Sequence, residues 1–321
     1  MDWPLLVFGR AALALIIERF TGYPQAIHKH ISHPVVWIGK LIEYLDQRLN
    51  KPGVSPWEGR MRGVAALALL IGASFVPAYI VADILSGWRI GWLVEVLLAT
   101  TLIAQKSLKD HVLDVHTALG RSLPEARRSV SMIVGRDPSE LDESGISRAA
   151  LESLAENSSD GIVAPVLWYA LLGLPGIVVY KAINTADSII GHKNEKYQWF
   201  GWASARLDDL VNLPASRLTG LLFAACRPPR FQEIVAVMRR DAPKHQSPNA
   251  GWPEAAMAAA LGLRFGGPRS YQGEVVELPW MGDGRSTLNR ADIKNGIKLM
   301  RNAMLLLAIS LLFVAILMPF G

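Results

Sequence analysis

The sequence contains little that could support thiol or disulfide chemistry. Its 321 residues include one cysteine, Cys226, which excludes an internal disulfide and any thiolate-based zinc or iron–sulfur site. It also has no Gly-x-x-x-x-Gly-Lys-Ser/Thr loop, no Gly-x-Ser-x-Gly elbow and no His-Glu-x-x-His helix. Gly282-Asp283-Gly284 lacks a third glycine, and the sequence predicts no strand before it. The common signatures of nucleotide-binding loops, hydrolases and metalloproteases are therefore absent.

Charged residues are also scarce, at 19% of the chain against 51% hydrophobic residues, whereas soluble domains carry about 25% charged residues. A membrane span needs about 20 largely apolar residues. The predicted spans are 3–17, 63–85, 88–104 and 304–320. Two further apolar segments, 162–183 and 210–226, are ambiguous or re-entrant, the first because Gly173-Leu174-Pro175-Gly176 interrupts it. We predict an all-α integral membrane protein with about four to six membrane segments in one domain, 1–321.

The basic residues predict an orientation. Lys and Arg number seven in 18–62, seven in 106–160 and twelve in 227–303, whereas 86–91 holds only Arg89. Basic residues accumulate on the cytoplasmic side, so we expect these three long segments in the cytoplasm of a multi-pass inner-membrane protein from a bacterium. The net charge of +5 has the same explanation, and no basic run interleaved with aromatics indicates nucleic-acid binding.

The polar segments between the spans have helical periodicity. Apolar residues recur every three or four positions in 107–120, 123–134, 147–157 and 290–304. The exception is 264–289, which is rich in Gly and Pro and is expected to hold a hairpin. We therefore expect helical cytoplasmic loops.

The first polar cluster contains Glu152, Glu156, Asn157 and Asp160. On a helix, Arg148, Glu152 and Glu156 form one stripe, and two glutamates four residues apart repel unless a cation lies nearby. Oxygen-rich groups of this kind suit Mg²⁺ that carries a phosphate, so we expect Glu156, Asn157 and Asp160 to bind the metal. The alternative is that Arg148 neutralises Glu152 and the remainder faces water.

The second and third clusters flank the polar stretch 184–206. Lys181, Asn184 and Ser188 share one helical face, with Asp187 at its border. Such a face next to an apolar segment indicates a cavity, with a structural polar network as the alternative. The third cluster contains Arg206, Asp208, Asp209 and Asn212, for which an interfacial helix with a charged face is the alternative reading.

The fourth cluster precedes the alanine-rich segment 255–263. It contains Ser247, Asn249 and Trp252, and Pro253 follows where a first helical turn tolerates proline. Free N–H groups at a helix start bind phosphates or carboxylates. Tight packing of the alanines explains the same pattern equally well.

Taken in order, these clusters resemble the CobD/CbiB family of cobalamin biosynthesis, the adenosylcobinamide-phosphate synthases. In the first half of the chain the matching stretches are His33-Pro34-Val35-x-x-Ile38-Gly39, Arg136-Asp137, Leu141-Asp142 and Glu152-x-x-Ala155-Glu156-Asn157-x-x-Asp160-Gly161-x-x-Ala164-Pro165. In the second half they are Tyr180-x-x-x-Asn184-Thr185-x-Asp187-Ser188, Gly191, Tyr197, Phe200-Gly201-Trp202, Ala205-Arg206-x-Asp208-Asp209, Pro214-Ala215-x-Arg217-Leu218, Ser247 to Ala258, Gly266-Gly267-Pro268 and Tyr271-x-Gly273. One departure is Tyr23, which stands where the family's Asp-x-x-x-Gly-Asp-Pro pattern has its second aspartate.

The resemblance implies an enzyme that forms an amide bond. Such an enzyme joins adenosylcobyric acid to (R)-1-amino-2-propanol or its O-phosphate, with ATP and Mg²⁺ as cofactors. On this basis we expect catalysis by six residues, namely Glu152, Glu156, Asp187, Arg206, Asp208 and Asp209. We expect the substrates to be bound by His33, Lys181, Asn184, Ser188, Ser247, Asn249, Trp252 and Tyr271. The implied partners are the lipid bilayer and other membrane-associated enzymes of cobalamin assembly, with no nucleic acid.

A second hypothesis is a corrinoid-handling membrane protein or transporter without catalysis. It requires the strongest polar residues to lie inside the spans and form a path across the membrane. Within the predicted spans we find only Arg10 and Glu95, apart from Asp83 and Arg89 near the ends of 63–85 and 88–104. The polar clusters instead lie beside the spans, which favours the enzyme. An activated acyl group hydrolyses unless water is excluded, so we predict that all four clusters share one enclosed cavity.

Overall fold

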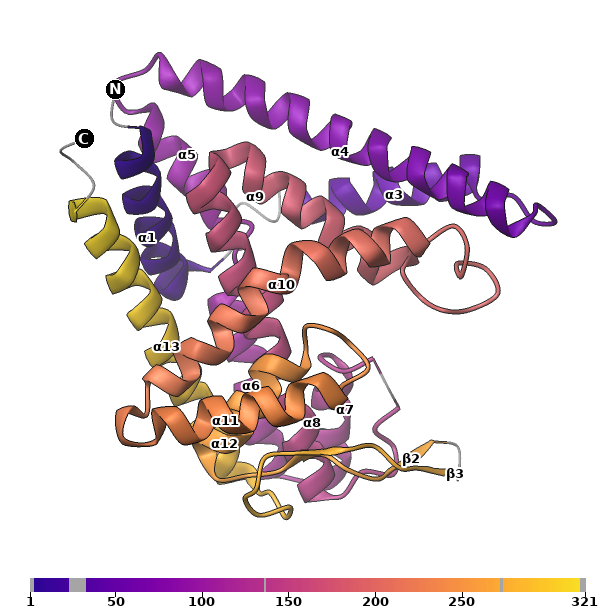
Figure 1. Ribbon diagram of the computed structural model, residues 1–321, viewed down its shortest axis with the longest axis vertical. Coiled ribbons are helices and arrows are strands. Elements are labelled where there is room, and N and C mark those ends of the chain that lie inside the picture. Colours follow the sequence, from indigo (N-terminus) through magenta and orange to yellow (C-terminus); the bar gives the residue numbers. More distant parts are fainter. Residues whose placement is uncertain (1–2, 23–32, 136, 272–273, 318–321) are drawn as a thin grey trace. The chain divides into compact units, whose positions relative to one another are not determined.

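The computed structural model describes residues 3–22, 33–135, 137–271 and 274–317, and it is almost entirely helical (Figure 1). The chain divides into two compact units, each of which is built from separate stretches of sequence. Unit 1 comprises Met1–Ala104, Ala164–Asn212 and Ser310–Gly321, and unit 2 comprises Gln105–Val163 and Leu213–Ile309. The predicted single domain 1–321 thus contains two packed bodies, because the helical segments between the apolar stretches form a core of their own.

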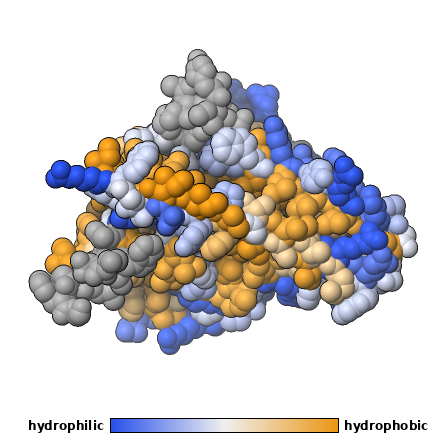
Figure 2. Space-filling view, turned by 90° about the horizontal axis from the view of Figure 1, so that it is seen from above, coloured by the Kyte–Doolittle hydropathy of each residue, from blue (hydrophilic) through white to orange (hydrophobic). Residues whose placement is uncertain are grey.

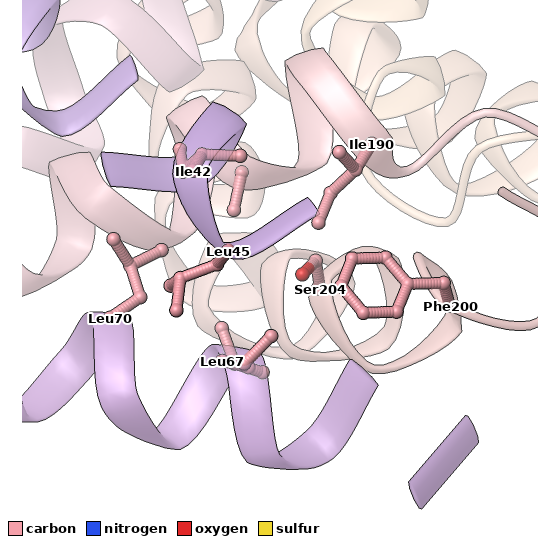
Figure 3. Close-up of a pocket in the computed structure, with 9 residues that line it drawn as sticks. Ile42, Leu45, Leu67, Leu70, Ile190, Phe200 and Ser204 are labelled. Atoms are coloured by element: carbon pink, nitrogen blue, oxygen red, sulfur yellow. The ribbon is translucent and has the colours of Figure 1, made fainter. Parts of the chain in front are cut away.

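Unit 1 contains the helices α1 (Trp3–Thr21), α3 (Pro34–Leu49), α4 (Pro56–Ser86), α5 (Gly91–Thr100) and α9 (Ala164–Ile190), and the first half of α10 (Trp202–Ala225). α3 lies alongside α4, and both pack on α9. Apolar side chains from these helices and from Phe200 enclose a small pocket (Figure 3), whose lining is Ile42, Leu45, Ala66, Leu67, Leu70, Ala186, Ile190, Phe200 and Ser204. This core fixes α3, α4 and α9 against one another.

The helix starts of α3 and α4 follow the same local rule. Pro56 occupies the first turn of α4, and the Ser55 hydroxyl accepts a hydrogen bond from the Glu58 N–H at 3.2 Å. Pro34 opens α3 in the same way, with His33 Nδ1 accepting from the Val35 N–H at 3.2 Å. In both cases a side chain satisfies an N–H group that the helix itself cannot satisfy.

α9 is interrupted at Gly173, as the Gly-Leu-Pro-Gly sequence suggested. Gly173 has φ 65° and ψ −157°, a conformation outside the helical region and one that glycine adopts readily. A Cβ atom placed on Gly176 would lie 2.4 Å from the Trp168 carbonyl oxygen. In a straight helix, residues eight positions apart are separated by about 12 Å, so the chain folds back at Gly173. The apolar segment 162–183 is therefore two helices rather than one straight span.

A partly buried ion pair lies beside this break. Arg10 of α1 donates to Glu95 of α5 at 2.8 Å, and Glu95 Oε1 lies 3.9 Å from the position of a Cβ on Gly173. Both residues are notable in the sequence because each places a charge inside a predicted span. They neutralise each other where α1, α5 and α9 pack together, which fits the rule that buried charges are paired.

Three described helical stretches are long and apolar enough to cross a membrane, namely α4, Glu143–Ile190 and α13 (Arg290–Leu317). α4 exposes large apolar side chains, including Val64, Leu69, Phe75, Val76 and Ile80. Figure 2 shows a surface that is hydrophobic over much of this side of the molecule. The prediction of an all-α membrane protein is confirmed. One predicted span looks different in the structure, because 88–104 contains only the ten-residue α5, about 15 Å long. The ambiguous segment 162–183 is interrupted at Gly173.

Unit 2 contains α6 (Gln105–Leu119), α7 (Leu123–Ser131) and α8 (Glu143–Ser158), and α8 continues into the π-helical turn η1 (Ser159–Val163). It also contains the second half of α10, η2 (Pro228–Arg230), α11 (Phe231–Asp241), η3 (Ala242–Lys244), α12 (Gly251–Leu261) and most of α13. α8 packs on α6, α7 and α12 and is buried along most of its length. The four predicted loop helices are confirmed as α6, α7, α8 and the start of α13.

Four short strands lie between α12 and α13. β1 (Phe265–Gly266) pairs antiparallel with β4 (Trp280–Met281), and β2 (Arg269–Tyr271) pairs antiparallel with β3 (Glu274–Val276). The second pair is a hairpin, as expected for 264–289. Gly266 and Gly267 have φ values of 73° and 76°, which explains the glycines at the turn between β1 and β2.

We predict that Gly63→Ala destabilises the protein by about 1–3 kcal/mol, because the new methyl group would overpack a tight contact. A Cβ on Gly63 would lie 2.0 Å from the Phe200 carbonyl oxygen. Gly72→Ala on the same helix is the matched control, since a Cβ there has no atom within 4 Å and alanine favours the helix. Thermal unfolding in detergent should show a lower midpoint for Gly63→Ala only, and equal midpoints for the two variants would contradict the packing.

Candidate functional site

A chain of buried polar groups joins α9 to α10 in unit 1. The Tyr180 hydroxyl donates to Asn212 Oδ1 at 2.9 Å, and Asn212 Nδ2 donates to Asp208 Oδ2 at 3.0 Å. Asn184 Nδ2 donates to the other carboxylate oxygen, Asp208 Oδ1, at 3.3 Å. Asp208 and Asn212 are buried, so the carboxylate of Asp208 is held at both oxygens by amide donors.

Helical spacing brings these residues together. Tyr180, Asn184 and Ser188 recur every four residues on α9, and Asp208 and Asn212 are four residues apart on α10. Residues at this spacing share one face. The second and third sequence clusters therefore meet along the contact between two helices, as a polar site and not as two separate charged surfaces.

The Asp208 carboxyl binds its proton more tightly than an ordinary aspartate does. Burial raises its pKa from 3.8 to about 7, with a further contribution from the charge of Asp187. The hydrogen bonds from Asn184 and Asn212 favour the charged form and limit the shift. At neutral pH this carboxyl can therefore either accept or release a proton.

Charged groups surround Asp208 at the edge of the site. Burial raises the pKa of Asp209, and the charges of Arg206 and Lys193 oppose that effect. Arg206 Nη1 lies 3.5 Å from Asp209 Oδ2. Lys181 is half-buried on α9. The Ser188 hydroxyl, on the same helix, donates to the Asn184 carbonyl at 2.9 Å. Carboxylates and cations thus lie close to each other within one unit.

Asp187 lies in the last turn of α9, next to Gly191. Its carbonyl accepts from the Gly191 N–H at 2.7 Å, and a Cβ on Gly191 would lie 1.9 Å from Asp187 Oδ1. A larger residue at 191 would displace the carboxylate. This close approach explains why the resemblance to the family includes Gly191 together with Asp187.

In unit 2, Glu152 and Arg148 of α8 both bind the main chain of Gly266. Glu152 Oε1 accepts from the Gly266 N–H at 2.8 Å, while Arg148 Nη1 donates to the Gly266 carbonyl at 3.2 Å. Arg148 also donates to the Ser286 carbonyl at 2.7 Å and lies 4.9 Å from the centroid of the Trp280 ring. Glu152, which we expected in catalysis, is buried and ties α8 to β1.

Glu156, Asn157 and Asp160 lie where α8 becomes the π-helical turn. Glu156 and Asn157 are exposed, and Asp160 is half-buried. Asn157 Nδ2 donates to the Ser153 carbonyl at 2.9 Å and to its hydroxyl at 3.2 Å, which orients the amide. Across the described residues, no group of three His, Cys, Asp or Glu side chains is placed to hold a metal ion. Two carboxylates with one amide oxygen suit Mg²⁺, which keeps several waters or phosphate oxygens as further ligands.

The fourth cluster builds the start of α12. The Ser247 hydroxyl accepts from the N–H groups of Asn249 and Ala250, both at 3.2 Å. Asn249 Oδ1 accepts from Arg217 Nη1 at 2.9 Å, and the Arg217 guanidinium lies 4.5 Å from the centroid of the Trp252 ring. Arg217 was not among the expected site residues, although it belongs to the Pro-Ala-x-Arg stretch of the family resemblance.

The expected site residues therefore fall into two groups. Unit 1 brings together the clusters around Asp187 and Asp208, and unit 2 holds those around Glu156 and Asn249. His33, expected to bind substrate, caps α3, and the side chain of Tyr271 lies outside the described residues. Tyr180 and Asn212, which complete the Asp208 network, were missing from the expected set. The single cavity for all four clusters stays a prediction.

Comparisons with known proteins agree with the resemblance. A family model described as CobD/Cbib protein matches residues 11–300. The chain is 52% identical over 294 residues to a cobalamin biosynthesis protein CobD of Rhodobacter capsulatus, covering 91% of this chain and 92% of that protein. Proteins of the same name from Rhizobium meliloti and Sinorhizobium fredii are 48% and 46% identical, covering 89% and 94% of this chain and 90% and 95% of those proteins. No solved structure gives a significant match.

The raised pKa of Asp208 predicts a pH-dependent stability. Between 3.8 and about 7 the folded protein keeps a proton that the unfolded chain has lost, so this carboxyl lowers the free energy of unfolding as pH rises through that range. Asp208→Asn should flatten this dependence in thermal unfolding, while Asp114→Asn, an exposed control on α6, should not. Identical pH profiles for wild type and Asp208→Asn would contradict the assignment.

Proposed function

Because the chain belongs to the CobD/CbiB family, we propose that it catalyses the amide-forming step of cobalamin biosynthesis that the resemblance to this family implies. In this proposal adenosylcobyric acid is joined through a propionate side chain to (R)-1-amino-2-propanol or its O-phosphate. The protein would act as a multi-pass protein of a bacterial inner membrane, beside other membrane-associated enzymes of the pathway. The relatives' printed name supports the pathway, and the arrangement around Asp208 supports the chemistry.

The observation that carries this proposal is the Asp208 carboxyl with its pKa near 7. An amine attacks a carboxyl group only after losing a proton, and a free alkylammonium holds that proton at neutral pH. General bases work best when their pKa lies near the working pH. Asp208 has the required pKa, and Asn184 and Asn212 fix its orientation, so we assign it the role of base.

Neighbouring charges suit the two substrates. Asp187 and Asp209 would attract the ammonium group before it is deprotonated, since both lie close enough to Asp208 to influence its charge. Arg206 and Lys181 would balance the negative charge of phosphate oxygens. These residues belong to unit 1, so this part of the proposal needs only contacts within one compact body.

ATP with Mg²⁺ would supply the phosphoryl group that activates the carboxylate, which does not condense with an amine unaided. The donor set that fits the metal is Glu156, Asn157 and Asp160. Asn157 is oriented by Ser153, and a helix that changes from α to π at Ser159 sets the direction of Asp160. Glu152 has a different task in this scheme, because its bond to Gly266 holds α8 in position.

We predict that the purified protein in detergent converts adenosylcobyric acid, an aminopropanol substrate and Mg-ATP to a condensed product. Mass spectrometry should detect the corrinoid with the amine added and one water lost. Omission of ATP is the control and should abolish the product. A folded protein that gives no product with either aminopropanol or its phosphate would contradict the proposed function.

We also predict that Glu156→Gln lowers the rate at least tenfold with little change in the unfolding midpoint. The substitution keeps the shape of an exposed side chain but removes a charge that would bind Mg²⁺. Glu140→Gln, at another exposed glutamate of unit 2, is the matched control. Activity of Glu156→Gln within a few-fold of wild type would show that the Arg148–Glu152–Glu156 stripe is structural.

A further inference from the structure

The outer face of α3 combines aromatic and basic side chains. Ile42 and Leu45 point into the core of unit 1 (Figure 3), while Trp37, Lys40, Tyr44 and Arg48 recur every three or four residues on the other side. Trp37 is 55% exposed and Tyr44 is 52% exposed. Large amphipathic rings alternating with cations are typical of residues at the level of lipid headgroups.

The register between α3 and α4 fixes where this face lies along the apolar helix. Arg62 Nη1 donates to the carbonyl of Leu49, the last residue of α3, at 3.3 Å. Beyond Arg62, α4 contains no charged residue from Gly63 to Ala82, a length of about 30 Å that matches the hydrocarbon core of a bilayer. The end of α3 therefore lies at the level where the apolar part of α4 begins.

Basic residues gather at this level. Arg48 lies 5.4 Å from the centroid of the Tyr44 ring, and Lys51 Nζ donates to the Gln47 carbonyl at 3.1 Å. Trp57, which follows in the first turn of α4, is 71% exposed. We call Arg48 and Lys51 the basic collar. In Figure 2, hydrophilic residues lie beside the apolar surface at the end where α4 begins.

The nearby carboxylates do little to neutralise the basic collar. Asp46 is buried and bound by Lys196 Nζ at 2.7 Å, and Glu58 is bound by Arg62 at 2.7 Å. Glu43 is the remaining carboxylate of α3 and is exposed beside Lys40. The exposed charge at the end of the helix pair, from Arg48 to Lys51, is positive, which attracts anionic groups.

We propose that the basic collar binds the phosphate groups of anionic phospholipids, with Tyr44 and Trp57 placed at the same membrane interface. The proposal is independent of the enzymatic activity. It follows from the alternation of rings and cations on α3, from its register on α4, and from the paired state of Asp46 and Glu58. Attraction of Lys and Arg to an anionic membrane surface corresponds to roughly a fivefold preference per residue.

The test compares lipid retention by native mass spectrometry of protein purified in a mixture of phosphatidylglycerol and phosphatidylcholine. Wild type should retain phosphatidylglycerol preferentially. The double variant Arg48→Gln/Lys51→Gln should lose roughly fivefold of that preference per charge removed. Arg128→Gln, at an exposed arginine of α7, removes one positive charge away from the collar; this control should behave as wild type. An unchanged preference in the double variant, with an unchanged unfolding midpoint, would overturn the proposal.

A second measurement reports the position of α3. Gln47→Cys in a Cys226→Ser background carries a fluorescent label, and the protein is reconstituted in vesicles of the same two lipids. A nitroxide on the lipid headgroup should quench the label more strongly than iodide in the water. Quenching by iodide alone would overturn the proposal. Loss of the lipid preference when soluble glycerol phosphate is added would also overturn it, because the collar would then be a site for a free phosphate.

Discussion

The reversal of the chain at Gly173 is the constraint on which the arrangement of unit 1 depends. An uninterrupted helix from Ala164 to Ile190 would be about 40 Å long. Tyr180 and Asn184 would then lie far from the part of α9 that packs beside Glu95. The left-handed φ of Gly173 turns the second half of α9 back, so that it packs against α3 and α4. The polar face of that second half then meets α10, and the Asp208 network forms at their contact.

The sequence allowed the local parts of this structure to be predicted. Periodicity predicted α6, α7 and α8, and spacing of four residues predicted that Asn184 and Ser188 would share a face. The Gly-Leu-Pro-Gly motif predicted the interruption of α9, because glycine and proline disfavour a continuous helix. Membership of the family also followed from the order and length of the motifs, which cover most of the chain from 33 to 273.

Contacts between distant residues could not be predicted in this way. The partner of Glu152 is the backbone of Gly266, which lies 114 residues away, and a backbone group leaves no signature in a motif. Arg217 and Asn249 are separated by 32 residues, and the same holds for Tyr180 and Asn212. Helix length is also hard to read from composition. The segment 88–104 is largely apolar apart from Arg89 and Glu95, yet its helix α5 ends at Thr100, where the chain turns.

The pairing of Arg10 with Glu95 also has a consequence for biosynthesis. The two residues are 85 positions apart, so Arg10 leaves the ribosome well before its counter-charge has been made. An unpaired arginine in an apolar environment is costly, and α1 gains its neutralising partner only when α5 arrives. The final seating of α1 is therefore a late event in translation, and the ion pair couples the integration of the first helix to the synthesis of a segment that follows α4.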